Sequence, residues 1–155
     1  MDTTLVTFKI GSEFYGIDIM EVQEIISLPE ITPIPNSPSF VDGVINLRGG
    51  IIPVVDLGKR FNFEIRELTE DEIRLRGIVI IKVEGMIIGV IIDQVNRVIS
   101  INEDEIQPPP QVIAGIGSEY IEGVSKTDDN LLTILNVKKL FSKQELLQLS
   151  CATNN

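Results

Sequence analysis

The sequence predicts a mainly β protein made of two small barrels of about five strands each. Ile and Val supply 26 and 14 of its 155 residues, and these β-branched side chains pack well on a pleated sheet. Turn residues interrupt the apolar runs at short intervals, as at Gly11-Ser12, Gly49-Gly50 and Glu84-Gly85. Strand and helix patterns do not alternate along the chain, so a doubly wound parallel sheet is not favoured.

An internal repeat indicates that the two barrels are copies of one another. Residues 9–26 recur as residues 82–99 at an offset of 73. Two segments between residues 40 and 57 recur between residues 120 and 137 at an offset of 80. Because the offsets stay constant over several segments, duplication explains the similarity better than chance does.

The repeat divides a single domain, residues 1–155, into two halves. We expect the first barrel at about residues 12–66 and the second at about 85–135. The charged stretch Glu64–Arg76 is the expected connector. The outer strands either stay within their own copy or are exchanged between the barrels.

Helix signals are few. Asp18 and Glu21 are spaced as a capping box for one short turn. The best helix pattern covers residues 136–149, with Asn136 as the N-cap. Four apolar residues fall on one face of this predicted helix: Val137, Leu140, Phe141 and Leu147.

Charge and composition argue against several functional classes. Lys and Arg number 13 against 23 Asp and Glu, which gives a net charge of −10, whereas nucleic acids and anionic membranes attract basic surfaces. The chain has no His and one Cys, Cys151, so it lacks the commonest general base and any thiolate cluster or disulfide framework. We therefore expect no catalytic residues, no metal and no cofactor, and hence no enzyme.

The sequence contains no pattern for a membrane span or a secretory signal. Residues 1–4 are not basic, and the apolar stretch Gly77–Ile92 is interrupted by Lys82 and Glu84. A spanning helix needs about 20 apolar residues. The sequence therefore predicts a cytoplasmic protein.

Two carboxylates have alternative interpretations. Asp56 and Asp93 each follow an apolar strand. A carboxylate in that place can cap a turn or a helix, whereas an acid–base pair would also require a pocket around both groups.

The segment Asn46–Gly50 is the strongest candidate for a binding site. Gly49-Gly50 between two apolar runs predicts a two-residue hairpin turn, whose positive φ values suit glycine. Arg48 precedes this turn and offers five N–H donors to a partner, while the second copy carries Lys126 at the corresponding place. Pro53 cannot donate to a sheet ladder, so its strand is either an edge or bulged. An open edge either receives another chain or is protected from one.

Around this turn the sequence resembles the CheW family, the coupling proteins of bacterial chemotaxis. The resemblance is carried by Gly43–Gly49, which reads GVINLRG, and by Ile52–Leu57, which reads IPVVDL. It extends to Tyr15–Ile19, Val22–Ile25 and Gly89–Asp93, and so covers nearly the whole chain. The resemblance implies two intertwined five-stranded SH3-like barrels, which agrees with the repeat, and the helix pattern over residues 136–149 adds a short C-terminal helix.

The resemblance implies a non-catalytic adaptor. Such an adaptor couples the cytoplasmic tips of methyl-accepting chemotaxis receptors to the regulatory domain of the histidine kinase CheA in a signalling array. Two alternatives remain: a coupling domain of a related two-component pathway, and a tandem-barrel domain that binds a small ligand or acts as an enzyme. A deep polar pocket with convergent carboxylates would favour the enzyme, and a shallow apolar groove would favour the adaptor.

The resemblance also implies where partners bind. Val22, Glu24, Gly43 and Arg48 match positions that the family uses for partner binding. Val98 is the repeat counterpart of Ile25, and we expect it on the facing wall of a groove between the barrels. The predicted protein-binding residues are therefore Val22, Glu24, Ile25, Gly43, Arg48 and Val98.

Overall fold

The strands assemble into two five-stranded sheets. The structure, a computed structural model, describes residues 2–61, 67–108, 112–113, 116–117, 120–127 and 130–153. The first sheet has the order β3 (Val22–Ser27), β6 (Gly77–Val83), β7 (Met86–Ile92), β5 (Gly50–Asp56) and β4 (Val41–Leu47). The second has the order β11 (Ile121–Thr127), β12 (Asn130–Leu135), β2 (Glu13–Asp18), β1 (Asp2–Ile10) and β8 (Gln94–Asn102). A short ribbon joins β9 (Val112–Ile113) to β10 (Ile116–Gly117).

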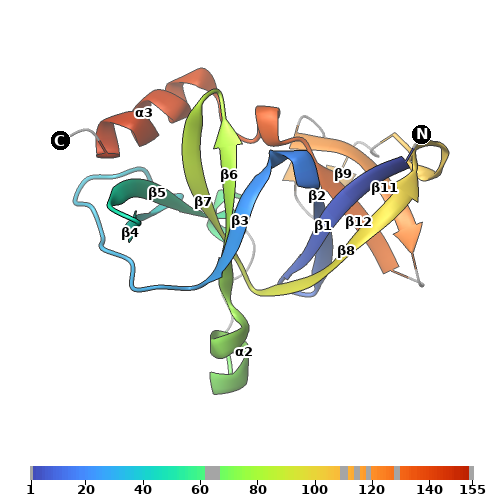
Figure 1. The fold of residues 1–155 in the computed structure, drawn as a ribbon, viewed down its shortest axis with the longest axis horizontal. Helices are drawn as coiled ribbons and strands as arrows, with labels where there is room; N and C mark the ends of the chain where they lie inside the picture. The colour runs from blue at the N-terminus through green and yellow to red at the C-terminus, as the bar shows by residue number, and fades with distance from the viewer. Residues whose placement is uncertain are drawn as a thin grey trace.

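This architecture confirms the predicted fold class, with one correction. The protein is mainly β, its two sheets have five strands each, and a helix ends the chain (Figure 1). Each sheet ends at two edge strands, β3 and β4 in the first and β11 and β8 in the second. Hydrogen bonds between the described strands therefore do not close either sheet into the predicted barrel.

The two halves of the chain exchange strands. Strands β1 and β2 at the N-terminus complete the second sheet, and β6 and β7, which begin the second copy, complete the first. Residues 12–66 and 85–135 therefore do not each enclose one sheet. Strands of the two halves pair antiparallel between β3 and β6 and between β1 and β8. They also form one parallel pairing in each sheet, Leu132 opposite Phe14 and Val54 opposite Gly89, which a pattern of hairpins does not predict.

The repeat is visible in the irregularities of the strands. On β3 the register with β6 skips Gln23, and on β8 the register with β1 skips Asn96. These two β-bulges lie 73 residues apart, as the sequence repeat requires. Because a bulge re-aims the side chains that follow it, the two copies keep the same strand geometry as well as the same apolar pattern.

The helices are short. They are η1 (Ile19–Glu21), α1 (Leu57–Arg60), α2 (Glu70–Leu75), η2 (Glu103–Glu105), η4 (Val137–Lys139) and α3 (Lys143–Thr153). Asp18 caps η1 as predicted, and its Oδ1 accepts a hydrogen bond from the Met20 N–H at 2.9 Å. Helix α2 lies in the expected connector, whose residues 64–66 are outside the described residues. Within the described chain, no helix has the length and apolar character needed to cross a bilayer.

The helix predicted over residues 136–149 is divided in two. Asn136 caps η4, accepting a hydrogen bond from the Lys138 N–H at 3.1 Å, and α3 starts again at Lys143. Because the new start changes the helical phase, Leu149 is buried whereas Leu147 is 67% exposed. The prediction that Leu147 faces the core was therefore wrong.

The main hydrophobic core joins both halves. Phe40 stacks on Phe141 with ring centroids 6.1 Å apart, and Phe61 packs on Tyr120 at 5.9 Å. In each copy the two aromatic positions correspond at the offset of 80, so each ring packs on a ring of the other half. Such aromatic pairs add about 1 kcal/mol each beyond the area they bury.

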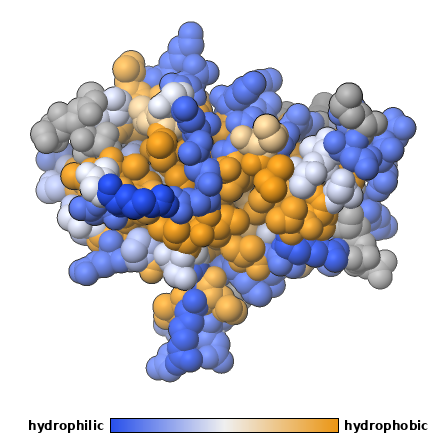
Figure 2. Space-filling model, viewed as in Figure 1, coloured by the Kyte–Doolittle hydropathy of each residue, from blue (hydrophilic) through white to orange (hydrophobic). Residues whose placement is uncertain are grey.

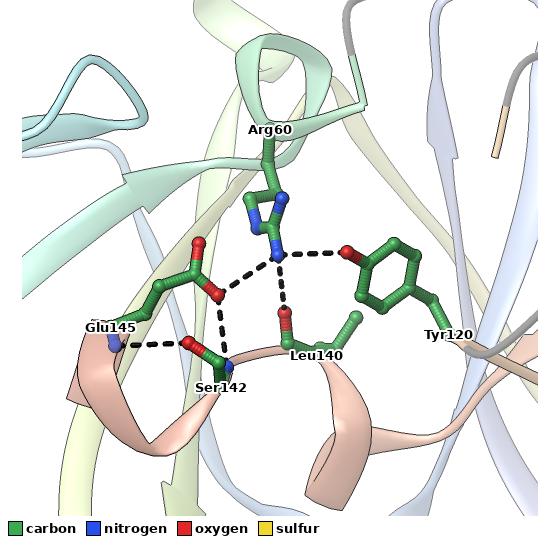
Figure 3. Close-up of polar contacts among 5 residues, drawn as sticks. All are labelled: Arg60, Tyr120, Leu140, Ser142 and Glu145. Atoms are coloured by element: carbon green, nitrogen blue, oxygen red, sulfur yellow. Dashed lines mark hydrogen bonds and ion pairs between the residues drawn. The ribbon is translucent and has the colours of Figure 1, made fainter. Parts of the chain in front are cut away.

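Arg60, the last residue of α1, fastens the C-terminal segment to this core (Figure 3). Its Nη2 donates to Tyr120 Oη at 3.1 Å, to the Leu140 carbonyl at 3.4 Å and to Glu145 Oε1 at 3.0 Å. Glu145 Oε1 also accepts from the Ser142 N–H at 2.9 Å, while Ser142 Oγ accepts from the Glu145 N–H at 3.1 Å. This reciprocal capping box starts α3, so Arg60 determines where the helix lies.

We expect Arg60→Met to lower the free energy of unfolding by about 2 kcal/mol or more, because it leaves the largely buried Glu145 carboxylate without its cation. Arg74→Met is the matched control, since Arg74 on α2 makes exposed ion pairs with Glu70 and Asp71 at 3.7 and 3.6 Å, and such pairs contribute about 0.5 kcal/mol or less. Urea denaturation of both variants measures the difference. Equal losses would show that Arg60 does not fasten the C-terminal segment.

Candidate partner-binding site

The β4–β5 hairpin turns at Arg48-Gly49. Leu47 pairs with Gly50, and the φ angles of Arg48 and Gly49 are +51° and +84°. Two successive positive φ values are the pattern of a type I′ turn. The predicted turn centre, Gly49-Gly50, was therefore wrong by one residue, and Gly50 belongs to β5.

Arg48 adopts this left-handed conformation at the expense of local strain, because a Cβ atom is disfavoured at positive φ. Asn46 supports the turn, since its Oδ1 accepts a hydrogen bond from the Gly49 N–H at 3.0 Å. The β6–β7 hairpin has a residue in the same conformation, since Glu84 has a φ of +52°. The hairpin geometry thus imposes the backbone conformation of Arg48, whose side chain is 67% exposed.

Arg48 forms an ion pair and hydrogen bond with Glu24 of β3. Strands β3 and β4 are the two opposite edges of the first sheet, so this contact joins the two edges through side chains. The hydrogen bond from Arg48 lowers the pKa of the Glu24 carboxyl, desolvation acts in the opposite direction, and the attraction between the charges adds to the lowering. The pair therefore stays ionised at neutral pH.

Gly43 has a role in the backbone. Its φ is +151°, and a Cβ built on it would lie 2.2 Å from the Thr32 carbonyl oxygen. The loop before β4 approaches here because Thr32 and Val44 exchange two backbone hydrogen bonds of 2.9 Å. In the second half Gly123 is also crowded, by the Gln107 carbonyl oxygen at 2.9 Å. Gly43 is buried, so its role is to let the Thr32 loop approach β4, and its side-chain position does not face a partner.

The apolar residues among the predicted set lie on two edge strands. Ile25 on β3 is 37% exposed and Val98 on β8 is 57% exposed, whereas Val22 is half-buried and packs against the main core. Strands β3 and β8 both lie on the face viewed in Figure 1, and Figure 2 shows apolar surface across the middle of that face. Val98 belongs to the second sheet, whereas Glu24 and Arg48 belong to the first sheet and its hairpin.

Residues beside the turn complete the description of this end of the sheet. Pro53 lies opposite Val44, and the parallel pairing of β5 with β7 begins one residue later, at Val54. Strand β5 lies between β7 and β4, and the irregularity of the β4–β5 pairing falls on β4, so the expectation that the strand of Pro53 is an edge or bulged was wrong. Pro53 is tolerated because the pairing with β7 begins only after it. Ile51, which the sequence analysis did not select, is also exposed beside the turn, whereas the neighbouring Ile52 is buried; because the two residues are identical, the sequence held no signal that separates them.

The two aspartates that could have formed an acid–base pair have structural partners. Asp56 and Asp93 face Arg76 at 3.7 and 3.6 Å. Asp56 also accepts a hydrogen bond from the Lys59 N–H at 3.3 Å, and Asp93 accepts one from the Gly11 N–H at 2.7 Å. Among the residues that the structure describes, no three Cys, Asp or Glu side chains gather as a metal site would require.

The structure also corrects which residue corresponds to Arg48 in the second half. Strand β4 ends at Leu47 and β11 ends at Thr127, which are 80 residues apart. The counterpart of Arg48 is therefore position 128, occupied by Asp, and Lys126 is the counterpart of Asn46. Asp128 lies outside the described residues.

Comparisons with known proteins agree on one family. The family model of the CheW-like domain matches residues 4–145. The chemotaxis protein CheW of Treponema pallidum (strain Nichols) is 47% identical over 146 residues, covering 94% of this chain and 86% of the relative. The chemotaxis protein CheW of Klebsiella aerogenes is 34% identical over 139 residues, covering 90% and 81%. The crystal structure of the scaffolding protein TtCheW from Thermoanaerobacter tengcongensis matches with a TM-score of 0.83 and 40% identity, covering 94% of this chain and 91% of that one.

We expect Gly43→Ala to lower the free energy of unfolding by about 3 kcal/mol, since the added methyl group forces the Thr32 loop away from β4. Gly49→Ala is the control, because Gly49 also has a positive φ but has no atom within 4 Å of the point that its Cβ would occupy, and strain alone costs about 1 kcal/mol. Thermal and urea unfolding of both variants give the comparison. Similar losses would mean that strain, and not the approach of Thr32, requires glycine at position 43.

We expect the carboxyl of Glu24 to titrate below the ordinary pH range of glutamate, and to return to that range in Arg48→Ala. A depressed pKa in the folded state means that the pair stabilises the protein above the unfolded pKa, and that this contribution is lost as pH falls through the folded pKa. Carbon-detected NMR titration of the Glu24 carboxyl measures both values. An unchanged midpoint in Arg48→Ala would contradict the pairing.

Proposed function

The chain belongs to the CheW family, and from this premise we propose that it is a non-catalytic adaptor of bacterial chemotaxis. It links the cytoplasmic tips of methyl-accepting receptors to the regulatory domain of the histidine kinase CheA, and holds both in a signalling array. This role places the protein in the cytoplasm. The family match and the chemotaxis names of the relatives support the proposal, as does the scaffolding role in the name of the matching structure.

The exposed guanidinium of Arg48 carries the proposal at the level of residues. It lies at the hairpin turn, and Glu24 holds it in place while leaving part of its five-donor fork accessible. A fixed, exposed arginine is suited to a carboxylate or to backbone carbonyls of a partner. Ile51 near the turn and Ile25 on β3 are exposed apolar residues of the same sheet, and an arginine together with apolar area is typical of the centres of protein interfaces.

The other predicted residues have different parts in this proposal. Val22 and Gly43 position the strands that carry Glu24 and Arg48, so we expect their substitution to act through shape. Val98 offers an apolar contact on the second sheet. Because it lies on a different sheet from Arg48, an adaptor with two partners can use the two areas separately.

The alternative of a related two-component pathway predicts the same surface with a different kinase and receptor. Binding to a kinase regulatory domain and a receptor fragment from the same cell distinguishes it. The enzyme alternative is weakened by the pairing of Asp56 and Asp93 with Arg76, because both carboxylates are engaged with a cation and with backbone N–H groups.

We expect Arg48→Ala to weaken binding to the kinase regulatory domain, the receptor fragment or both by at least about tenfold, since a charged hydrogen-bond acceptor in the interface is left unpaired. Its melting temperature should change by no more than about 2 °C, because the side chain is exposed. Isothermal titration against each partner and a thermal melt give both readouts. Lys126→Ala, an exposed cation at the matching hairpin end of the second sheet, is the control and should bind normally.

Exchanging the two charges of the pair distinguishes a direct contact between Arg48 and a partner from an effect of the ion pair on the shape of the sheet. The double variant Glu24→Arg, Arg48→Glu can restore the ion pair between the sheet edges but not the arginine at the turn. If binding returns in the double variant, Arg48 acts by joining β3 to β4. Unchanged affinity of Arg48→Ala for both partners would remove the residue-level support for the adaptor site.

A further inference from the structure

An apolar groove lies between helix α3 and the turn of the β6–β7 hairpin. Its apolar lining comes from Val83 and Met86 of the hairpin and from Phe141, Leu146 and Leu147 of the C-terminal segment. The groove has a volume of about 510 Å³, which is within the range of pockets that hold a small ligand or several side chains. None of the described residues that line it belongs to the hairpin of Arg48, so the adaptor function proposed above does not use it.

The rim of this groove is basic on one side and acidic on the other. Lys138 and Lys143 line it on the side of α3, and Glu84 lines it on the side of the hairpin. Two neighbouring lysines stand out in a chain with a net charge of −10. An apolar groove with such a rim suits a short segment that has an apolar centre, an acidic end and a basic end.

Helix α2 is a segment of this kind. Residues 70–72 in its first turn are all acidic, and Ile73 in the next turn is 53% exposed. Thr69 and Glu72 form a complete capping box, with both hydrogen bonds at 3.1 Å, so the helix is formed before it meets a partner. Figure 1 shows α2 projecting from the sheets, and Figure 2 shows apolar surface on it.

The order of side chains on one face of α2 matches the groove. Glu70, Ile73 and Arg74 are spaced three and four residues apart, and therefore lie on the same face of the helix. In the single chain Arg74 pairs with Glu70 and Asp71, and because these pairs are exposed they are weak enough to be replaced on docking. The acidic end faces Lys138 and Lys143 when Ile73 enters the apolar floor and Arg74 approaches the acidic side of the rim. The opposite arrangement of the helix would bring like charges together.

We propose that the protein associates with itself head to tail, with helix α2 of one copy docked in the groove beside α3 of a second copy. Helix α2 lies at the lower end of the view in Figure 1 and α3 at the upper end. The two surfaces are different and lie far apart on one chain, so the contact is heterologous and each copy keeps a free helix or a free groove for another. Association therefore continues beyond a dimer.

The contact is small. A helix of six residues covers far less than the roughly 1,200–2,000 Å² buried in stable protein complexes. The association is therefore weak, and its charged part is screened by salt. We expect a monomer at about 10 µM and growing assemblies at several hundred micromolar in low salt, with the assemblies shortened at about 0.5 M salt.

Sedimentation velocity of the full chain tests the proposal with two complementary variants. Ile73→Glu removes the apolar centre of α2, and Leu147→Glu blocks the groove at an exposed position. Each variant alone should remain a monomer of 17.2 kDa. An equimolar mixture should form dimers that grow no further, because the first variant keeps its groove and the second keeps its helix. Leu131→Glu, at another exposed leucine on β12, is the matched control and should assemble as the unmodified chain does.

The results that would overturn the proposal are also specific. They are an unmodified chain that stays monomeric to about 1 mM, assembly that persists in Ile73→Glu or Leu147→Glu, and a mixture of the two variants that forms no dimer. If the unmodified chain stays monomeric while one variant loses affinity for the kinase or receptor fragment, α2 or the groove belongs to that partner instead. Circular dichroism and thermal melts of both variants confirm that each is folded. Failure here leaves the Arg48 experiment unaffected, since neither substitution touches that turn.

Discussion

The exchange of strands between the two halves is the constraint on which the rest of the fold depends. Each sheet is completed by a parallel pairing with a strand from the other half, β7 beside β5 and β2 beside β12. Neither half can therefore satisfy its own backbone hydrogen bonds alone. The aromatic pairs between Phe40 and Phe141 and between Phe61 and Tyr120 lie across the same junction, so the two halves share one main core and are expected to unfold together.

The exchange also explains which strands form the edges of the first sheet, where the proposed binding residues Glu24 and Arg48 lie. Because β6 and β7 occupy its centre, β3 and β4 are left on the outside. Unpaired strand edges expose backbone donors and acceptors, which natural proteins cover or protect. Here Thr32 covers part of β4 through two backbone hydrogen bonds, and the Glu24–Arg48 pair joins the two edges. The charged groups that protect the sheet are thus the groups best placed to meet a partner.

Sequence patterns predicted the strands, the repeat and a hairpin turn within Asn46–Gly50, but they did not predict how the strands are shared. Apolar alternation reports which residues are buried, and it is the same whether β6 and β7 pair within their own copy or with the other. The location of the turn at Arg48-Gly49 was missed because glycine preference favours Gly49-Gly50, whereas the register of Leu47 with Gly50 determines the turn. Similarly, the break before Lys143 depends on Arg60 and Glu145, which are 85 residues apart, and no local pattern reports such a contact.

The difference between the two halves matters more for function than their similarity. Both keep the β-bulge at Gln23 and Asn96 and the crowded glycine before the hairpin. At the next position after each bulge, however, Glu24 in the first half corresponds to Arg97 in the second. Arg48 likewise corresponds to Asp128, so the sequence reverses the sign of charge at both positions of the pair.

Because of this reversal, the two halves of a duplicated backbone carry opposite charges at equivalent positions. A carboxylate on a partner is attracted to Arg48. At the corresponding position of the second half the sequence has Asp128, and two negative charges placed together oppose binding. An adaptor has to hold two different partners in a defined order, and a symmetric duplicate would bind the same partner twice. Duplication therefore supplies the two sheets, and the change of charge at equivalent positions distinguishes them.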